Sequence, residues 1–195
     1  MTWNIIKQVL FEAERYIDSK TMDTGGLAKL IVVSSLVPAI IGALVALGIS
    51  ISGIQPYSGF PLGDFLGSLG AGTIVISFIG VIIGAVLALF IGGAVLHAFA
   101  LLVGANKEYN DTLAALSVGL VPALVLGWIP VVNVFVGVYA GAALVYALAR
   151  KQGLNLWRAS IAVSLPAVII GLIIYIGIAF TTPDLLQLLL PQLSL

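Results

Sequence analysis

The stretch TLAALSVGLVPALVLGWIPVVNVFVGVYAGAALVYALA occupies residues 112–149 and determines the architecture of the chain, because it contains no charged side chain. One helix needs about 20 apolar residues to cross the hydrocarbon core of a bilayer, so this stretch is nearly long enough to cross twice. Near its middle lies a cluster typical of a turn at a membrane interface, which consists of Gly127, Trp128, Pro130 and Asn133. We therefore expect a helical hairpin with spans near 112–128 and 131–149.

Basic residues flank this hairpin on both sides, with Lys107 before it and Arg150 and Lys151 after it. Cytoplasmic loops carry an excess of Lys and Arg, so both ends of the hairpin are expected on the cytoplasmic side. Each arm is slightly short for a full crossing, so a shallow re-entrant pair is the alternative to two spans.

The composition places the whole chain in a membrane. Of its residues, 61% are hydrophobic and 8% are charged, against about 25% charged in an ordinary soluble domain. Three further charge-free stretches supply spans near 30–52, 74–103 and 160–180. The expected fold is an all-α, polytopic membrane helix bundle that forms a single membrane domain over residues 1–195.

The basic residues all fall in segments that a five-span topology places on one side. They are Lys7, Arg15, Lys20, Lys29, Lys107, Arg150, Lys151 and Arg158. Arg150, Lys151 and Arg158 are therefore interpreted as topology determinants that meet anionic lipid headgroups. The N-terminus is expected in the cytoplasm and the C-terminus outside.

Residues 1–20 have the pattern of an amphipathic helix that precedes the first span. One face gathers Trp3, Ile5, Ile6, Val9, Leu10, Ala13, Tyr16 and Ile17. This face either lies in the lipid interface, with Trp3 at headgroup depth, or packs on the cytoplasmic ends of the bundle.

Small residues recur at four-residue spacing in two of the expected spans, a pattern that lets helices approach closely in lipid. The positions are Gly80, Gly84, Ala88 and Gly92 in one span and Gly137 and Gly141 in another. We interpret them as packing seams within one chain, with a dimer interface as the alternative.

His97 is the one histidine of the chain and lies inside the cytoplasmic end of the 74–103 span. An ionisable group at membrane depth suggests a proton relay or a ligand contact. A hydrogen bond from its ring to a neighbouring helix is the favoured interpretation. No Asp, Glu, Lys or Arg lies inside an expected span, which disfavours ion-coupled transport.

The loop before the hairpin is the densest polar segment between spans. Asp111 or Thr112 is a candidate cap for the following helix, because their side chains can accept hydrogen bonds from its free N–H groups. The alternative is a small cytoplasmic recognition patch that consists of Lys107, Glu108, Tyr109 and Asp111.

The residue types exclude several classes of chemistry. The chain has no cysteine and one histidine, so we expect no metal site and no cofactor. No nucleophile is paired with a base, so no catalytic residue is assigned and the protein is expected not to be an enzyme. The scattered basic residues disfavour nucleic acid as a partner. The expected partners are membrane lipids and either another membrane protein or a second copy of the chain.

Residues 96–166 resemble the core of the Yip domain (Ypt-interacting protein) family in its archaeal and bacterial form. The shared features are a Gly-containing loop, a Thr-Leu pair that opens the third span, a Pro midway along it, an Ile-Pro turn and a Gly-Leu loop before the last span. The segment IIKQVLFEAERYIDS, residues 5–19, is similar to the segment before the first span of that family. It differs near Glu12 and Ala13, where the family often has a proline.

This resemblance implies a five-span integral protein of a prokaryotic cell membrane with a cytoplasmic N-terminus. Eukaryotic relatives are linked to vesicle traffic and to Rab-type small GTPases, and no residue of this chain carries that role over. The leading hypothesis is a non-enzymatic scaffold or adaptor in membrane organisation or a trafficking-like process. The alternatives are a small permease or lipid- or solute-binding protein built around a cavity near His97, and an accessory subunit of a larger membrane complex.

Overall fold

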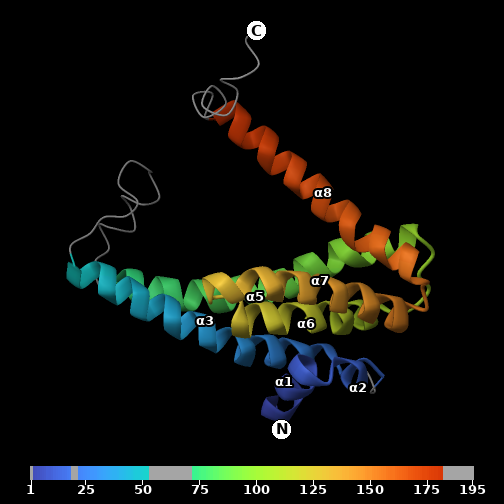
Figure 1. The fold of residues 1–195 in the computed structure, drawn as a ribbon, viewed down its shortest axis with the longest axis horizontal. Coiled ribbons are helices and arrows are strands. Elements are labelled where there is room, and N and C mark those ends of the chain that lie inside the picture. The colour runs from blue at the N-terminus through green and yellow to red at the C-terminus, as the bar shows by residue number, and fades with distance from the viewer. Residues whose placement is uncertain (1, 19–21, 53–71, 182–195) are drawn as a thin grey trace.

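The computed structural model describes residues 2–18, 22–52 and 72–181, and the secondary structure in these ranges is helical (Figure 1). The helices are α1 Thr2–Phe11, α2 Ala13–Asp18, α3 Thr24–Ser52, α5 Gly72–Leu102, α6 Tyr109–Leu126, α7 Pro130–Gln152 and α8 Leu156–Thr181. Lys20, Asp64 and Asp184 lie outside the described residues.

Five of these helices, α3, α5, α6, α7 and α8, are long and apolar enough to cross a membrane. The predicted all-α membrane bundle is therefore confirmed. Helix α3 begins at Thr24 and α8 at Leu156, several residues before the spans expected at 30–52 and 160–180. The expected spans were started after the last charged residue. The helices begin earlier, because a turn that contains a charged residue such as Lys29 or Arg158 can still form helical hydrogen bonds.

The predicted hairpin is formed by α6 and α7. Gly127 caps α6 through its backbone N–H, which donates to the carbonyl of Ala123, and Pro130 occupies the first turn of α7. Proline suits that position because the first N–H groups of a helix have no partner within it. The Trp128 indole N–H donates to the carbonyl of Val125 at 2.9 Å, which satisfies another free group of the turn.

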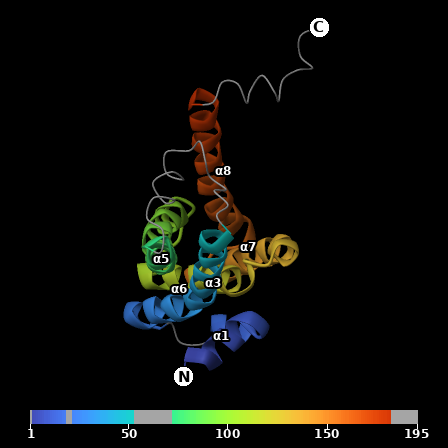
Figure 2. The same cartoon turned by 90° about the vertical axis from the view of Figure 1, so that its left-hand side faces the viewer.

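Helix α6 is the centre of the molecule and contacts α3, α5, α7 and both N-terminal helices. Figure 1 shows α3, α5, α6 and α7 running side by side, and Figure 2, turned by 90°, shows α8 leaving them. Helix α8 contacts α5 and α7 near its start, where Ala159, Ala162 and Pro166 are buried. Its residues 167–177 are all exposed.

The N-terminal segment is two short helices rather than the single amphipathic helix expected over residues 1–20. The interruption falls at Glu12. Ile6, Val9, Tyr16 and Ile17 are buried in the protein core, so the predicted apolar face packs on the bundle, as the second of the two interpretations held. This packing reaches along the side of α6, because Tyr16 meets Ser117 well beyond its first turn.

The glycine seams expected within one chain are corrected by the structure. A Cβ atom built on Gly80, Gly84, Gly137 or Gly141 would meet nothing within 4 Å, and Ala88 is exposed. Gly92 meets a side chain only at an ordinary van der Waals distance, 3.7 Å from Leu116 Cδ2. The intramolecular interpretation is therefore wrong for the stripe as a whole, and a contact between copies stays a prediction.

Two other glycines permit the close helix contacts. A Cβ on Gly93 of α5 would collide with the Leu113 side chain of α6. A Cβ on Gly119 of α6 would lie 3.1 Å from the Ala140 carbonyl oxygen and 3.3 Å from Leu144 Cβ of α7. Both glycines are buried, so they allow α5 and α7 to approach α6, which is the packing device that membrane helices depend on.

Candidate functional site

A buried polar cluster joins α5, α6 and α7 at the end of the bundle where most of the basic residues lie. His97 Nδ1 lies 2.8 Å from the Thr112 hydroxyl oxygen, and the Gln152 side-chain amide donates to the same oxygen at 2.7 Å. Thr112 and Gln152 are fully buried. The favoured interpretation of His97, a ring hydrogen bond to a neighbouring helix, is confirmed.

The Thr112 hydroxyl serves both of its neighbours in this cluster. Its oxygen accepts from the Gln152 amide and also lies within hydrogen-bond distance of His97 Nδ1, since a hydroxyl has two lone pairs and one hydrogen. The cluster can hold three helices together, and its geometry presents no nucleophile activated by a base.

Gln152 also fixes the loop between α5 and α6. Its side-chain oxygen accepts the backbone N–H of Lys107 at 3.3 Å, and its side-chain nitrogen lies 3.2 Å from the carbonyl of Glu108, to which it donates. Within the described residues, no buried side-chain nitrogen or oxygen lacks a hydrogen-bond partner. The cluster is therefore fully satisfied, as a polar group away from water requires.

Tyr109 points into the bundle and not into the surface patch that the sequence suggested. Its hydroxyl donates to the carbonyl of Phe90 at 2.7 Å, and its ring meets the His97 ring edge to face at 5.5 Å. Lys107 and Glu108 are exposed, and Asp111 is partly buried. Of the four proposed patch residues, Lys107 and Glu108 are the two that face outward.

The capping residue of α6 also differs from the expectation. The N-cap is Glu108, whose side chain makes no capping hydrogen bond, rather than Asp111 or Thr112. Thr112 is used by the buried cluster instead. Asp111 lies in the first turn of α6, where its negative charge suits the helix dipole, as predicted.

Further polar bonds connect the N-terminal segment to the same end. Asn110 donates to the carbonyl of Met22 at 2.7 Å and accepts from the Thr24 hydroxyl at 3.1 Å. Arg150 forms an ion pair with Asp18 at 3.0 Å. We call this end the basic face, and it is formed by α2, residues 103–108 and residues 150–158 at the α7 to α8 turn.

The comparison with protein families covers this whole arrangement. A family model described as the Yip1 domain matches residues 7–178, which extend from α1 to α8. The chain belongs to the Yip1 domain family. No curated protein and no solved structure matches it. Together with the five apolar helices, the match establishes a multi-pass membrane protein of this family.

Arg158 and Gly104 bring the start of α8 against the α5 to α6 loop of the Yip1 domain. Gly104 has a φ of +100°, and a Cβ there would lie 3.2 Å from an Arg158 guanidinium nitrogen. Gly153 has a φ of +67° and caps α7 through its N–H to Ala149. These two glycines shape the two turns that lie side by side on the basic face.

Tyr16 anchors the N-terminal helices of the Yip1 domain to α6. Its buried hydroxyl lies 3.3 Å from the Ser117 hydroxyl. Burial raises the pKa of Tyr16 above its ordinary value, and the hydrogen bond with Ser117 partly opposes that rise. The neutral phenol is therefore the form that the packed N-terminal segment stabilises.

Asn110 and Gln152 were not singled out in the sequence, yet both organise the basic face. Gln152 is the last residue of α7 and lies four residues after Leu148, which is fully buried. That spacing places the two side chains on one face of the helix. A polar residue in phase with a buried face was thus the available signal.

Proposed function

We propose that this Yip1 domain protein is a non-enzymatic scaffold or adaptor of a prokaryotic cell membrane, and that it binds its partner through the basic face. The observation that carries the proposal is the bonding of this face. Gln152 connects α7 to the α5 to α6 loop, Asn110 connects α6 to the N-terminal segment, and Arg150 connects α7 to α2. A surface held in one conformation loses little entropy when it binds a partner.

The exposed side chains of the basic face support a protein partner. Lys107, Glu108 and Arg158 are exposed and carry both signs of charge. Exposed charges contribute mainly to the specificity and the rate of binding, whereas a large apolar contact would contribute mainly to affinity. The partner is accordingly another membrane protein, a soluble protein at the membrane surface or a second copy of the chain.

The proposed orientation has the basic face and the N-terminus in the cytoplasm and the C-terminus outside. Lys29, Lys107, Arg150, Lys151 and Arg158 lie near helix ends that converge on this face. Loops rich in Lys and Arg stay on the cytoplasmic side. We also propose that the protein is not an enzyme, because the side chains of the His97 cluster are engaged in hydrogen bonds that connect helices.

Site-specific photocrosslinking in native membranes tests the proposed role. A benzoylphenylalanine at Lys107 or Glu108 is expected to capture the same protein, whether a partner or a second copy. The control is the same group at Val131, which is 75% exposed at the opposite end of α7. Equal capture from Val131, or no protein adduct from either site on the basic face, would contradict the proposal.

The permease hypothesis centred on His97 gains no supporting observation. The ring of His97 is engaged by Thr112 and Tyr109. The open groove described below has a different lining.

A further inference from the structure

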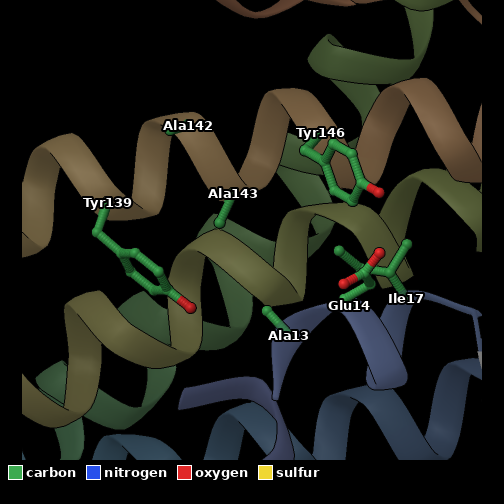
Figure 3. Close-up of a pocket in the computed structure, with 7 residues that line it drawn as sticks. All are labelled: Ala13, Glu14, Ile17, Tyr139, Ala142, Ala143 and Tyr146. Atoms are coloured by element: carbon green, nitrogen blue, oxygen red, sulfur yellow. The ribbon is translucent and has the colours of Figure 1, made fainter. Parts of the chain in front are cut away.

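A groove of about 330 Å³ lies between the N-terminal segment and α7. One wall consists of Ala13, Glu14 and Ile17 of α2, and the other of Tyr139, Ala142, Ala143 and Tyr146 of α7. Figure 3 shows the two tyrosine rings at either end of the α7 wall, with the small alanines between them. The volume is at the lower end of the range of small-molecule sites, which is about 300 to 1,000 Å³.

A second, apolar hollow of about 250 Å³ adjoins this groove at Tyr139, which lines both. Its other lining residues are Leu10, Phe11, Pro122, Leu126, Phe135 and Val136. From Phe135 to Tyr146 the two hollows follow α7 for about 17 Å at 1.5 Å per residue. That length is close to one leaflet of a hydrocarbon core about 30 Å thick.

The polar groups of the combined groove lie at the end nearest the basic face. Glu14 is exposed, and it forms no hydrogen bond or ion pair with the described residues. Arg150, which is paired with Asp18, lies close enough to Glu14 and Tyr146 to interact with them electrostatically. The opposite end of the groove has no charged lining residue.

The tyrosines add a preference for a cation. Tyr139 and Tyr146 are two helical turns apart on α7, and they line the wall of the groove opposite Glu14. Aromatic faces attract ammonium groups, and a carboxylate beside them strengthens that attraction. The Tyr139 hydroxyl lies 3.5 Å from the carbonyls of Val9 and Leu10, which holds the ring between the two hollows.

We propose that this groove binds one phospholipid with a primary-ammonium headgroup, taken from the leaflet that meets the basic face. The ammonium lies against Glu14 and Tyr146, the phosphate faces Arg150 at the same end of the groove, and an acyl chain passes Tyr139 and follows the apolar hollow toward the hairpin turn. Exposed apolar residues of α7 beside the groove, including Val134 and Val138, face the bilayer, so a lipid can enter sideways. This site is separate from the surface proposed for a protein partner.

Native mass spectrometry of the full chain, released from nanodiscs that contain phosphatidylethanolamine, phosphatidylcholine and phosphatidylglycerol in equal amounts, tests the site. The wild type is expected to retain one phosphatidylethanolamine in preference to the other two lipids. Glu14→Gln removes the charge without changing the shape, and roughly a threefold loss of that preference is expected. The matched control is Glu12→Gln, because Glu12 is an acid of the same segment that pairs with Arg15 outside the groove.

A steric variant provides a second, independent measurement. Ala143→Leu narrows the groove between the two tyrosines and is expected to lower retention of every lipid, whereas Ala167→Leu on exposed α8 is expected to leave retention unchanged. The melting temperature of each variant shows that its fold is intact. Equal retention of the three lipids by the wild type, or a Glu14→Gln protein that behaves like the wild type, would overturn the proposal. Photocrosslinking at Glu108 does not depend on this result, so the two proposals fail separately.

Discussion

Helices α6 and α8 are similar in sequence character and opposite in environment. Both are long enough to cross a membrane, and both contain an internal proline, Pro122 in α6 and Pro166 in α8. Half of the α6 span is buried inside the protein, against 17% of the α8 span. In α6 the small and hydroxyl residues are mostly buried, whereas the small residues at positions 167–177 of α8 are exposed.

This difference shows what selects the interior of a bundle in lipid. Ala114, Ala115, Ser117 and Gly119 are buried in α6, whereas the exposed part of α8 is rich in isoleucine. Lipid tails are as apolar as leucine, so hydrophobicity does not draw α8 into the bundle. Close packing and hydrogen bonds place α6 at the centre, and substitutions that remove either should affect α6 far more than α8.

The largest effect is expected from Gly119→Leu. The added side chain would meet the backbone of α7 at Ala140, and overpacking of this kind costs about 2 to 3 kcal/mol. Gly171→Leu in α8 is the control, because nothing lies within 4 Å of a Cβ there. Unfolding of both variants in mixed detergent micelles measures the difference. Equal free energies of unfolding would break the distinction between the two helices.

A smaller loss is expected from Gln152→Leu, which removes the bonds to Thr112 and to the backbone of Lys107 and Glu108. Thr112 keeps its bond with His97, and Lys107 and Glu108 are exposed, so water can replace part of what is lost. One unsatisfied buried group costs about 1 to 3 kcal/mol. Hydrogen exchange of the Lys107 amide should accelerate together with the loss of stability. Ser164→Ala, at an exposed position of α8, is expected to change neither quantity. An unchanged Lys107 exchange rate in Gln152→Leu would show that the cluster does not hold the loop.

The smallest effect is expected from Tyr16→Phe, which removes the phenol hydroxyl that hydrogen-bonds with Ser117 of α6. The pKa of Tyr16 is raised in the folded protein, so the unfolded chain loses this proton first as pH rises above about 10. The stabilisation by neutral Tyr16 is therefore complete below that pH and declines as pH rises through the folded pKa. Proteolysis at Lys7 and Arg15 should accelerate in that window for the wild type, and this step should be absent in Tyr16→Phe. Tyr175→Phe, in the exposed part of α8, is the control.

Several features of the fold follow from local chemistry and were predictable. The turn at Trp128 and Pro130 was recognisable because proline and an interfacial aromatic residue have position-specific roles in membrane proteins. The hydrogen bond of His97 was predictable in kind, since an ionisable ring at membrane depth needs a partner. Its partner Thr112 was expected to cap the following helix. The sequence does not show whether a hydroxyl near a helix start caps that helix or bonds to another one.

The glycines show the limit of such inference. Spacing places Gly80, Gly84 and Ala88 on one face of α5, but the face that packs contains Gly93, Leu89 and Leu96. In a soluble helix the polar side would identify the outer face. Helix α5 is apolar on every side, so its sequence has no marker of which face meets α6.

Composition and charge were sufficient for the membrane class, the number of spanning helices and the hairpin, because the solvent of each segment depends on its own residues. Which helix packs against each helix face is shown only by the tertiary structure. The positions of Gly93 and Gly119, the bonds of Asn110 and Gln152, and the packing of α1 and α2 along α6 depend on contacts between segments distant in sequence. In lipid these contacts are selected by shape and hydrogen bonding, and neither leaves a periodic pattern in a chain that is apolar on all sides.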